Sequence, residues 1–373
     1  NSLGIVQWMT DGIAILSDVN GHGDFPKLIS DGNNGAIISW NDDRNGEYHK
    51  AFAQRVNFSG VIQWTNNGIA ISTGQDHQTV SSIVSDNNGG AIISWDDARG
   101  ANLPPDTGYD IYSQRVNSNG IVQWANSGIL ICDAINTQNT PIMVSDNNGG
   151  AFITWTDYRT SVNSADIYAQ RVNSTGIIQW ANNGIPVAQI TGRQWEPKMI
   201  TDNNNGVIIT WDDRRQDPYT NIYSQRLNSN GMIQWSNNGV PISTASNNQY
   251  GPRIVSNDIG GGIISWIDYR NGTDYDVYTQ LVNTTGTLSV ETHSISNNLS
   301  LKVFPNPTYN TLYIEASNTL TSIEIYNLLG QQMLSFKPNT ITEEIDMSNL
   351  QVGMYLVKVT IGEQEATYKV LKQ

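Results

Sequence analysis

The sequence predicts an all-β protein, and three observations lead to this prediction. Short runs rich in β-branched and aromatic residues alternate with Asn- and Gly-rich turns, as at residues 90–95. The chain of 373 residues contains 33 Gly and 11 Trp, which suits many short strands joined by tight turns. No run of about ten residues within 1–286 has the apolar spacing of a helix.

The tryptophans repeat in two registers about 56 residues apart, for example from Trp8 to Trp64 and from Trp40 to Trp95. Five repeats cover residues 1–286, and each contains four predicted strands. In the second repeat these strands lie at residues 81–85, 90–95, 110–116 and 121–131. Tandem four-stranded units of about this length predict a β-propeller. An open array of small β domains is the competing interpretation.

The two ends of the repeat region predict a closed ring. Residues 5–15 have the pattern of a fourth strand with no third strand before it. Residues 277–282 have the pattern of a third strand whose successor lacks the Gln-Trp pair. We therefore expect the N-terminal strand to complete the last sheet and to close a five-bladed ring, which removes exposed sheet edges. A longer array with more blades is the alternative.

A Trp-x-Asp-x-Arg motif occurs in every repeat, and a Gln-Arg pair follows it in the first four. Chemistry at one centre needs different residues in different roles, so five identical copies indicate a scaffold rather than a catalytic or metal site. We expect Asp and Arg to pair while Trp packs between sheets. The copies are Trp40/Asp42/Arg44, Trp95/Asp97/Arg99, Trp155/Asp157/Arg159, Trp211/Asp213/Arg215 and Trp266/Asp268/Arg270.

Charge and cysteine content exclude several classes of function. The 20 Lys and Arg against 34 Asp and Glu give a net charge of −14, which argues against a nucleic-acid partner. No apolar run reaches about 18 residues, so no membrane span is predicted. Cys132 is the single cysteine, and no zinc pattern occurs, so we expect no cofactor and no metal. Calcium is the alternative at four turns that lack EF-hand ligand spacing, Asp31, Asp86, Asp146 and Asp202.

The predicted binding face carries the loops that vary between repeats, namely those before the first strand and between the second and third strands. On this face a glutamine recurs just before the first strand, next to aromatic residues. Amides beside aromatic rings suit sugars, because they bond hydroxyl groups while the ring stacks on C–H faces. The predicted ligand-binding residues are Trp195, Tyr250, Phe25, Gln78, Gln138, Gln194 and Gln249. The alternative is that the glutamines cap the innermost strands.

No catalytic residues are predicted. A glycoside hydrolase or lyase acting on polysaccharide is one alternative function, and it requires carboxylates that converge on one site. Asp24 and Glu196 are the nearest candidates, and the sequence contains no Gly-x-Ser-x-Gly or His-Glu-x-x-His motif. A passive surface or matrix protein is the other alternative.

Composition changes after the repeats. Residues 287–298 are polar and patternless, which predicts a linker. Residues 299–373 contain no Trp or Arg and several short alternating runs, which predict a small immunoglobulin-like β-sandwich. Motifs stand in order along this module, and their main residues are Pro305, Asn306, Pro307, Gly330, Gly353, Tyr355, Lys369 and Lys372.

Together these motifs resemble the type A C-terminal sorting domain of the type IX secretion system. The resemblance implies export across the outer membrane of a Gram-negative bacterium, with the translocon, an outer-membrane shuttle barrel and a sortase-type peptidase as partners. An ordinary adhesive domain is the alternative. No signal peptide is visible, so we expect the N-terminus to be processed or omitted. The sequence as a whole predicts a secreted or cell-surface protein that binds a glycan or another surface ligand without catalysis.

Overall fold

The computed structural model describes residues 6–17, 22–44, 46, 48–74, 76–99, 108–289, 301–327, 330–362 and 364–373. Every regular element in these residues is a strand, as the sequence predicted, and none is a helix that could cross a membrane. The chain forms two compact units, Asn1–Leu288 and Ser289–Gln373. Part of the predicted linker, residues 290–298, lies outside the described residues.

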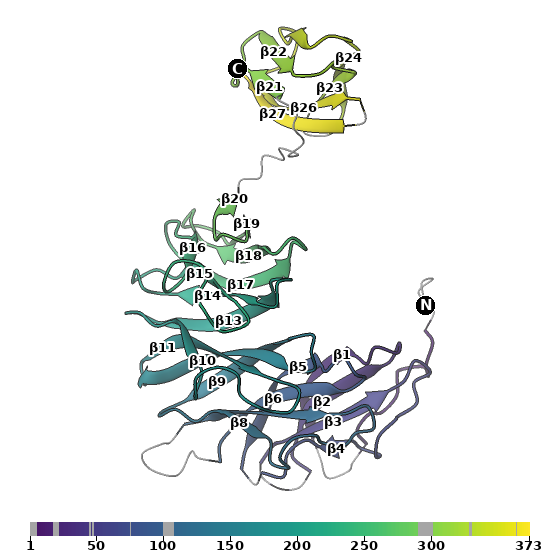
Figure 1. Cartoon of the computed structure of the whole chain (residues 1–373), viewed down its shortest axis with the longest axis vertical. Coiled ribbons are helices and arrows are strands. Elements are labelled where there is room, and N and C mark those ends of the chain that lie inside the picture. Colours follow the sequence, from purple (N-terminus) through teal and green to yellow (C-terminus); the bar gives the residue numbers. More distant parts are fainter. Residues whose placement is uncertain are drawn as a thin grey trace. The chain divides into compact units, whose positions relative to one another are not determined.

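The first unit contains five four-stranded antiparallel sheets, each formed by one repeat, and its fold is propeller-like (Figure 1). The first two sheets consist of β1 (Gly23–Ser30), β2 (Ala36–Asp42), β3 (Lys50–Val56) and β4 (Ile69–Ala70), and of β5 (Gln78–Ser85), β6 (Ala91–Asp97), β7 (Asp110–Val116) and β8 (Ile129–Cys132). The next two consist of β9 (Gln138–Ser145), β10 (Ala151–Ser161), β11 (Ser164–Val172) and β12 (Ile185–Ala188), and of β13 (Gln194–Thr201), β14 (Val207–Asp213), β15 (Asn221–Leu227) and β16 (Val240–Ser243). The fifth consists of β17 (Gln249–Ser256), β18 (Gly262–Asp268), β19 (Asp276–Val282) and β20 (Leu288–Ser289).

Local chemistry fixes the turn between the first and second strands. In the first sheet, Oδ1 of Asp31 accepts the backbone N–H groups of Asn33 and Gly35 at 2.8 and 2.7 Å. Oδ2 of the same carboxylate accepts Nε of Arg55 at 2.9 Å. Burial raises the pKa of Asp31, but these hydrogen bonds outweigh it and lower the pKa overall. Asp31 is one of the four turn residues at which calcium was the alternative prediction. Both of its carboxylate oxygens accept hydrogen bonds from the protein.

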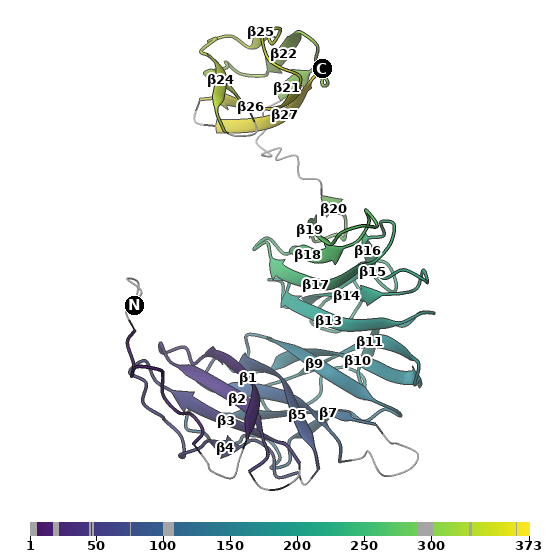
Figure 2. The same cartoon turned by 180° about the vertical axis from the view of Figure 1, so that it is seen from behind.

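Each sheet packs face to face on the next sheet in chain order. We call the face toward the following sheet the leading face and the opposite one the trailing face. Ile37 and Ala51 on the leading face of the first sheet share a core with Ile93 and Trp95 on the trailing face of the second. The innermost strands β1, β5, β9, β13 and β17 follow one another along the inside of an arc (Figures 1 and 2).

The structure does not show a closed ring. Residues 6–17 form no strand, and the indole N–H of Trp8 donates to the carbonyl of Phe58 in the first sheet at 2.9 Å. The fourth strand of the last sheet is β20, which follows the turn at Gly286. This segment lacks the Gln-Trp pair of the other repeats, but backbone pairing between strands does not require that pair. The predicted pairing of the N-terminal segment with residues 277–282 is therefore wrong, and the arc stays open (Figure 2).

The second unit is a β-sandwich, in agreement with the fold predicted for the C-terminal module. One sheet contains β21 (Leu301–Phe304), β22 (Thr311–Ala316) and β25 (Thr342–Asp346). The other has the order β24 (Gln332–Phe336), β23 (Ser322–Asn327), β26 (Gly353–Ile361) and β27 (Gln364–Lys372). Leu312, Ile323, Ile345 and Val357 form part of the buried core between them.

Candidate binding surface on the innermost strands

The innermost strands are irregular at one equivalent place. A register shift lies between Asp24 and Lys27 in β1, and matching shifts occur in the other four innermost strands. At this bulge a left-handed backbone occurs in four of the five strands, with φ of 49° at Phe25, 53° at Thr140, 52° at Glu196 and 66° at Gly251. Such a backbone costs a non-glycine residue roughly 1–3 kcal/mol and tends to occur at functional sites.

Contacts between neighbouring sheets hold these bulges in place. The backbone N–H of Thr140 donates to Asp96 Oδ1 on the preceding sheet at 3.0 Å, and that of Gly251 donates to Asp212 Oδ1 at 3.0 Å. In the first interface the same contact runs from Val80 N–H to Asn41 Oδ1 at 2.6 Å. The bulge is therefore a regular part of the interface, although its side chain differs in every repeat.

Asp96 and Asp212, whose carboxyl groups accept these backbone N–H groups, have unusual pKa values. Burial raises the pKa of Asp212 to about 7, and the negative charge of Glu196 acts in the same direction. The Gly251 N–H and the cations Lys198 and Arg253 partly oppose this rise. Burial likewise raises the pKa of the half-buried Asp96 to about 7. Near neutral pH these carboxyl groups exist in both protonation states.

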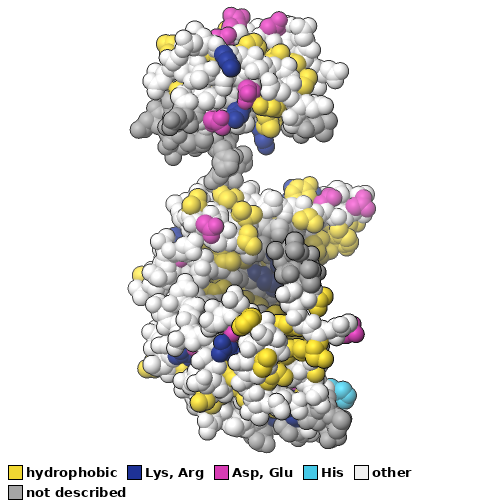
Figure 3. Space-filling model, turned by 90° about the vertical axis from the view of Figure 1, so that its right-hand side faces the viewer, with side chains coloured by type: hydrophobic (Ala, Val, Ile, Leu, Met, Phe, Trp, Pro, Cys, Tyr) yellow, Lys and Arg dark blue, Asp and Glu magenta, His cyan; other side chains and the backbone are white. Residues whose placement is uncertain are grey.

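A cavity of about 370 Å³ lies where the bulges of the first four sheets converge. Its lining combines an exposed aromatic ring, hydroxyl groups and charged side chains, and the view into the open side of the arc shows basic and hydrophobic side chains in a hollow (Figure 3). Burial and the charge of Arg253 lower the pKa of Lys198, the more enclosed of its two lysines. The polar and aromatic lining residues are Phe25, Lys27, Thr79, Ser81, Thr140, Glu196 and Lys198.

The predicted glutamine ring does not line this cavity. Gln78, Gln138, Gln194 and Gln249 are all fully buried. The amide of Gln78 donates to Ser72 Oγ at 2.9 Å and to Asp97 Oδ2 at 3.1 Å, both within its own sheet and loop. The amide of Gln249 donates to two carbonyl groups of the preceding loop. The glutamines fasten the variable loops to the innermost strands, so the prediction that they contact a ligand is wrong.

The three predicted aromatic residues are not together. Phe25 lines the cavity, whereas Trp195 and Tyr250 stand one residue before the bulge of their strands. The half-buried Trp195 ring lies between the guanidinium groups of Arg193 and Arg214, at 5.1 and 5.7 Å. A hydrogen bond with Tyr275 is the largest cause that raises the pKa of Tyr250 to about 12.

The candidate carboxylates for hydrolysis are not brought into one cavity. Glu196 lines the cavity, but Asp24 does not, and Oδ1 of Asp24 lies 4.0 Å from Nδ1 of His49. The His49 ring packs on His77 with 5.0 Å between their centroids. The described part of the chain contains no group of three residues placed to hold a metal ion.

The Trp-x-Asp-x-Arg motif forms the same unit in every sheet, which confirms its predicted scaffold role. In the third sheet, Trp155 Nε1 donates to Asp157 Oδ2 at 2.7 Å. Arg159 forms a bidentate pair with the same carboxylate and also bonds the carbonyl of Asn183 beside the fourth strand. The indole N–H of Trp155 and both oxygens of Asp157 are thus bonded within the sheet.

Sequence reasoning missed the lysines of the cavity. Lys27 and Lys198 occupy equivalent positions, two residues after the bulge residue. The available signal was the proline between each bulge residue and its lysine, Pro26 and Pro197, which recurs in the third and fifth repeats. Only the three-dimensional register shows that these positions face one cavity.

A second candidate surface lies in the C-terminal unit, where the first and last sequence motifs meet. Asn306 Nδ2 donates to the carbonyl of Lys369 at 2.8 Å, and its Oδ1 accepts the N–H of Leu371 at 3.0 Å. Thr308 adds a parallel bridge to Lys372. Gly330 supplies a left-handed turn at φ 79°, and the hydroxyl of Tyr355 donates to the carbonyl of Gln351. The motifs thus define one edge that includes the last strand.

A family model described as the secretion system C-terminal sorting domain matches residues 302–373. These residues are therefore a type IX sorting domain, and the protein is secreted or lies at the cell surface. No curated protein matches the chain.

Several solved structures resemble the chain at low identity. A protein of unknown function from Dyadobacter fermentans DSM 18053 has a TM-score of 0.48 and 12% identity, over 87% of this chain and 96% of its own. An endo-arabinase from Bacteroides thetaiotaomicron VPI-5482 has a TM-score of 0.34 and 12% identity, over 68% and 92%. A sucrose-6-phosphate hydrolase from Lactobacillus gasseri has a TM-score of 0.36 and 9% identity, over 94% and 86%. Similarity at this level carries no information on activity.

Proposed function

We propose that this secreted protein binds an acidic glycan, without catalysis, in the cavity formed by the innermost strands. The observation that carries the proposal is the pair of lysines, Lys27 and Lys198, in a cavity that also holds an exposed Phe25 ring. The two basic groups stand out in a chain with a net charge of −14. The partly desolvated ammonium group of Lys198 can form a strong hydrogen bond with the carboxylate of a uronic acid, and the exposed Lys27 adds a second positive charge.

The rest of the lining suits sugar rings. The hydroxyl groups of Thr79 and Ser81 can donate to or accept from sugar hydroxyls, and the face of Phe25 can stack on C–H groups. A glycosidase would need two carboxylates about 5–9 Å apart across the scissile bond. Among the described lining residues, Glu196 is the single carboxylate, so the cavity favours binding over hydrolysis.

Calorimetric titration with an oligogalacturonate and with a neutral oligogalactan tests this function. Lys198→Gln and Lys27→Gln should each weaken binding of the acidic oligomer about tenfold, the equivalent of roughly 1.4 kcal/mol. Lys302→Gln, in the sorting domain, is the matched control and should bind like the unchanged protein. Failure to bind the acidic oligomer, or full affinity in both cavity variants, would contradict the proposal.

We infer that the translocon, an outer-membrane shuttle barrel and a sortase-type peptidase handle the C-terminal unit. The support is the family match together with the edge where Asn306 joins β27. Deletion of residues 299–373 should leave the first unit in the periplasm, as cell fractionation would show. Normal secretion of the truncated chain would remove this assignment.

A further inference from the structure

The ends of the arc expose two sheet faces that are buried everywhere else in the first unit. On the leading faces of the first four sheets, Ala51, Ile111, Ile167 and Ile222 occupy one equivalent position and are 0% exposed. Their counterpart in the fifth sheet, Val277, is 81% exposed. The leading face of the fifth sheet is therefore built like the others, but no sheet formed by the described residues packs against it.

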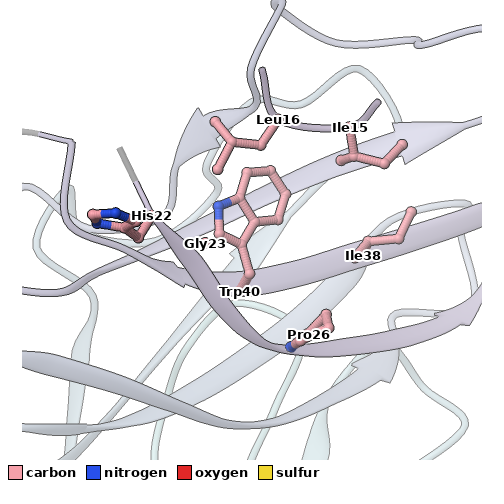
Figure 4. A pocket seen from close by; sticks show the side chains of 7 residues that line it. All are labelled: Ile15, Leu16, His22, Gly23, Pro26, Ile38 and Trp40. Atoms are coloured by element: carbon pink, nitrogen blue, oxygen red, sulfur yellow. The ribbon is translucent and has the colours of Figure 1, made fainter. Parts of the chain in front are cut away.

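The trailing face of the first sheet is exposed along its innermost strand, whereas Trp40 and Phe52 farther out on the same face are 4% and 6% exposed. Leu28 is 69% exposed, whereas its counterparts Met143 and Met199 are 5% and 7% exposed. An apolar cavity of about 460 Å³ lies on this face, with Trp40 and Ile38 among its lining residues (Figure 4). Figure 3 shows hydrophobic side chains on both sides of the opening of the arc.

The N-terminal segment, residues 6–17, makes the contacts with the first sheet that a preceding fourth strand makes in the internal interfaces. Trp8 bonds the carbonyl of Phe58 at 2.9 Å, just as Trp64 bonds the carbonyl of Ser118 in the next interface at 3.0 Å. The backbone N–H of Ser17 likewise donates to a side chain of the first sheet, Asn67, at 3.1 Å.

An internal interface repeats this second contact. The N–H of Asp133 donates to Asn183 Oδ1, also at 3.1 Å. Residues 6–17 thus stand where a preceding fourth strand would lie, with Ile15 and Leu16 against Trp40 (Figure 4). Among the described residues, no strands equivalent to the first three of a preceding sheet lie on this face.

The fifth sheet offers those three strands as β17, β18 and β19, and its fourth strand, β20, spans only Leu288–Ser289. It lacks the arginine that reaches the next sheet elsewhere, since Leu281 stands where Arg226 bonds the carbonyl of Thr284. On the receiving first sheet, Trp8 already makes the tryptophan contact of an internal interface.

We propose that the leading face of the fifth sheet docks on the trailing face of the first sheet of a second copy of this chain. The two faces of one chain lie apart across the opening of the arc, so both are available to another molecule (Figures 1 and 2). The contact joins two different surfaces, and such head-to-tail contacts produce rings or filaments.

The test is the mass of the full chain in solution, measured by light scattering during gel filtration between about 1 and 100 μM. The unchanged protein should form oligomers of the 41.1 kDa chain. Val277→Asp and Leu28→Asp should each give monomers, because each places a charge in the contact. Val162→Asp, at an exposed valine of the third sheet, is the matched control and should assemble normally.

A mixture of the two interface variants makes the test specific. Val277→Asp keeps an intact first sheet and Leu28→Asp keeps an intact fifth sheet, so an equimolar mixture should form a dimer and nothing larger. At the lowest protein concentration, where the control is also dissociated, the melting temperatures of both variants should match that of the control, since both positions are exposed in the single chain. An unchanged protein that stays monomeric at all concentrations overturns the proposal. A Val277→Asp variant that melts below the dissociated control also overturns the proposal, because the two faces would then meet within one chain.

Discussion

The Trp-x-Asp-x-Arg units and the bulges of the innermost strands both recur in every repeat, yet they differ in what varies. The motif is identical in five sheets and makes the same internal hydrogen bonds each time. In the second to fifth sheets the bulge keeps its backbone contact with the preceding sheet, but its side chain changes from Phe25 in the first sheet to Val80, Thr140, Glu196 and Gly251. Uniform residues build the frame, and the varied ones decide what the cavity presents to a ligand.

Replacing a frame tryptophan should have the largest effect. Trp155 is fully buried and its ring stacks near Tyr168, at 6.4 Å between centroids. Trp155→Ala leaves a cavity and removes the indole hydrogen bond to Asp157, so it should reduce the free energy of unfolding by about 3–5 kcal/mol. Thermal unfolding followed by tryptophan fluorescence measures this loss.

Trp195 is the matched control, because it is the tryptophan that lies outside both repeating registers. It is half-buried between two arginines, so Trp195→Ala should cost less than about 1 kcal/mol. If both variants lose the same free energy of unfolding, the distinction between the motif tryptophans and Trp195 is wrong.

The supporting carboxylates give the second prediction, which concerns pH. Asp212 keeps its proton up to about pH 7 in the folded protein, whereas an unfolded Asp loses it near pH 4. Unfolding therefore releases a proton between these values, and stability should fall as pH rises from about 4 to 7. Asp212→Asn should remove this part of the loss and stabilise the protein at pH 8, on the order of 1–4 kcal/mol.

Asn41 occupies the equivalent position in the first sheet and accepts the same backbone contact, so the substitution preserves the bulge. Urea unfolding at pH 5 and pH 8 provides the measurement. The exposed Asp274→Asn should leave the pH dependence unchanged. If Asp212→Asn is less stable than the unchanged protein at pH 8, the ionised carboxylate stabilises the interface and the predicted sign is wrong.

Sequence periodicity predicted the five sheets because packing requires a large ring at the same place in each repeat. The burial of Gln78 and Gln249 was harder to predict from the sequence. The sequence shows that these glutamines recur, but not that the loops before them fold back and enclose the amides. Their recurrence is better explained as a structural feature, by the same logic that applied to the Trp-x-Asp-x-Arg motif.

Ring closure could not be derived from strand order alone. A repeat pattern specifies which face packs on which, but the curvature of the arc depends on small rotations between successive sheets. The cavity shows a similar limit. Lys27 and Lys198 lie in repeats one and four, and only the bulges and their register bring them to one surface.

The smallest expected effect tests whether the bulge itself is strained. Glu196 adopts φ of 52°, and the fifth sheet places Gly251 at the equivalent position with φ of 66°. Glu196→Gly should therefore raise the free energy of unfolding by about 1 kcal/mol or less, because glycine adopts this backbone without a side-chain clash.

The reverse change is the matched control. A Cβ at Gly251 would meet only Ile267 Cδ1 at 4.0 Å, so Gly251→Glu has room and should cost a similar amount for backbone reasons alone. Urea midpoints at constant slope measure both changes. If Glu196→Gly lowers stability instead, its carboxylate stabilises the fold, and Glu196 belongs with the frame rather than with the ligand-facing residues.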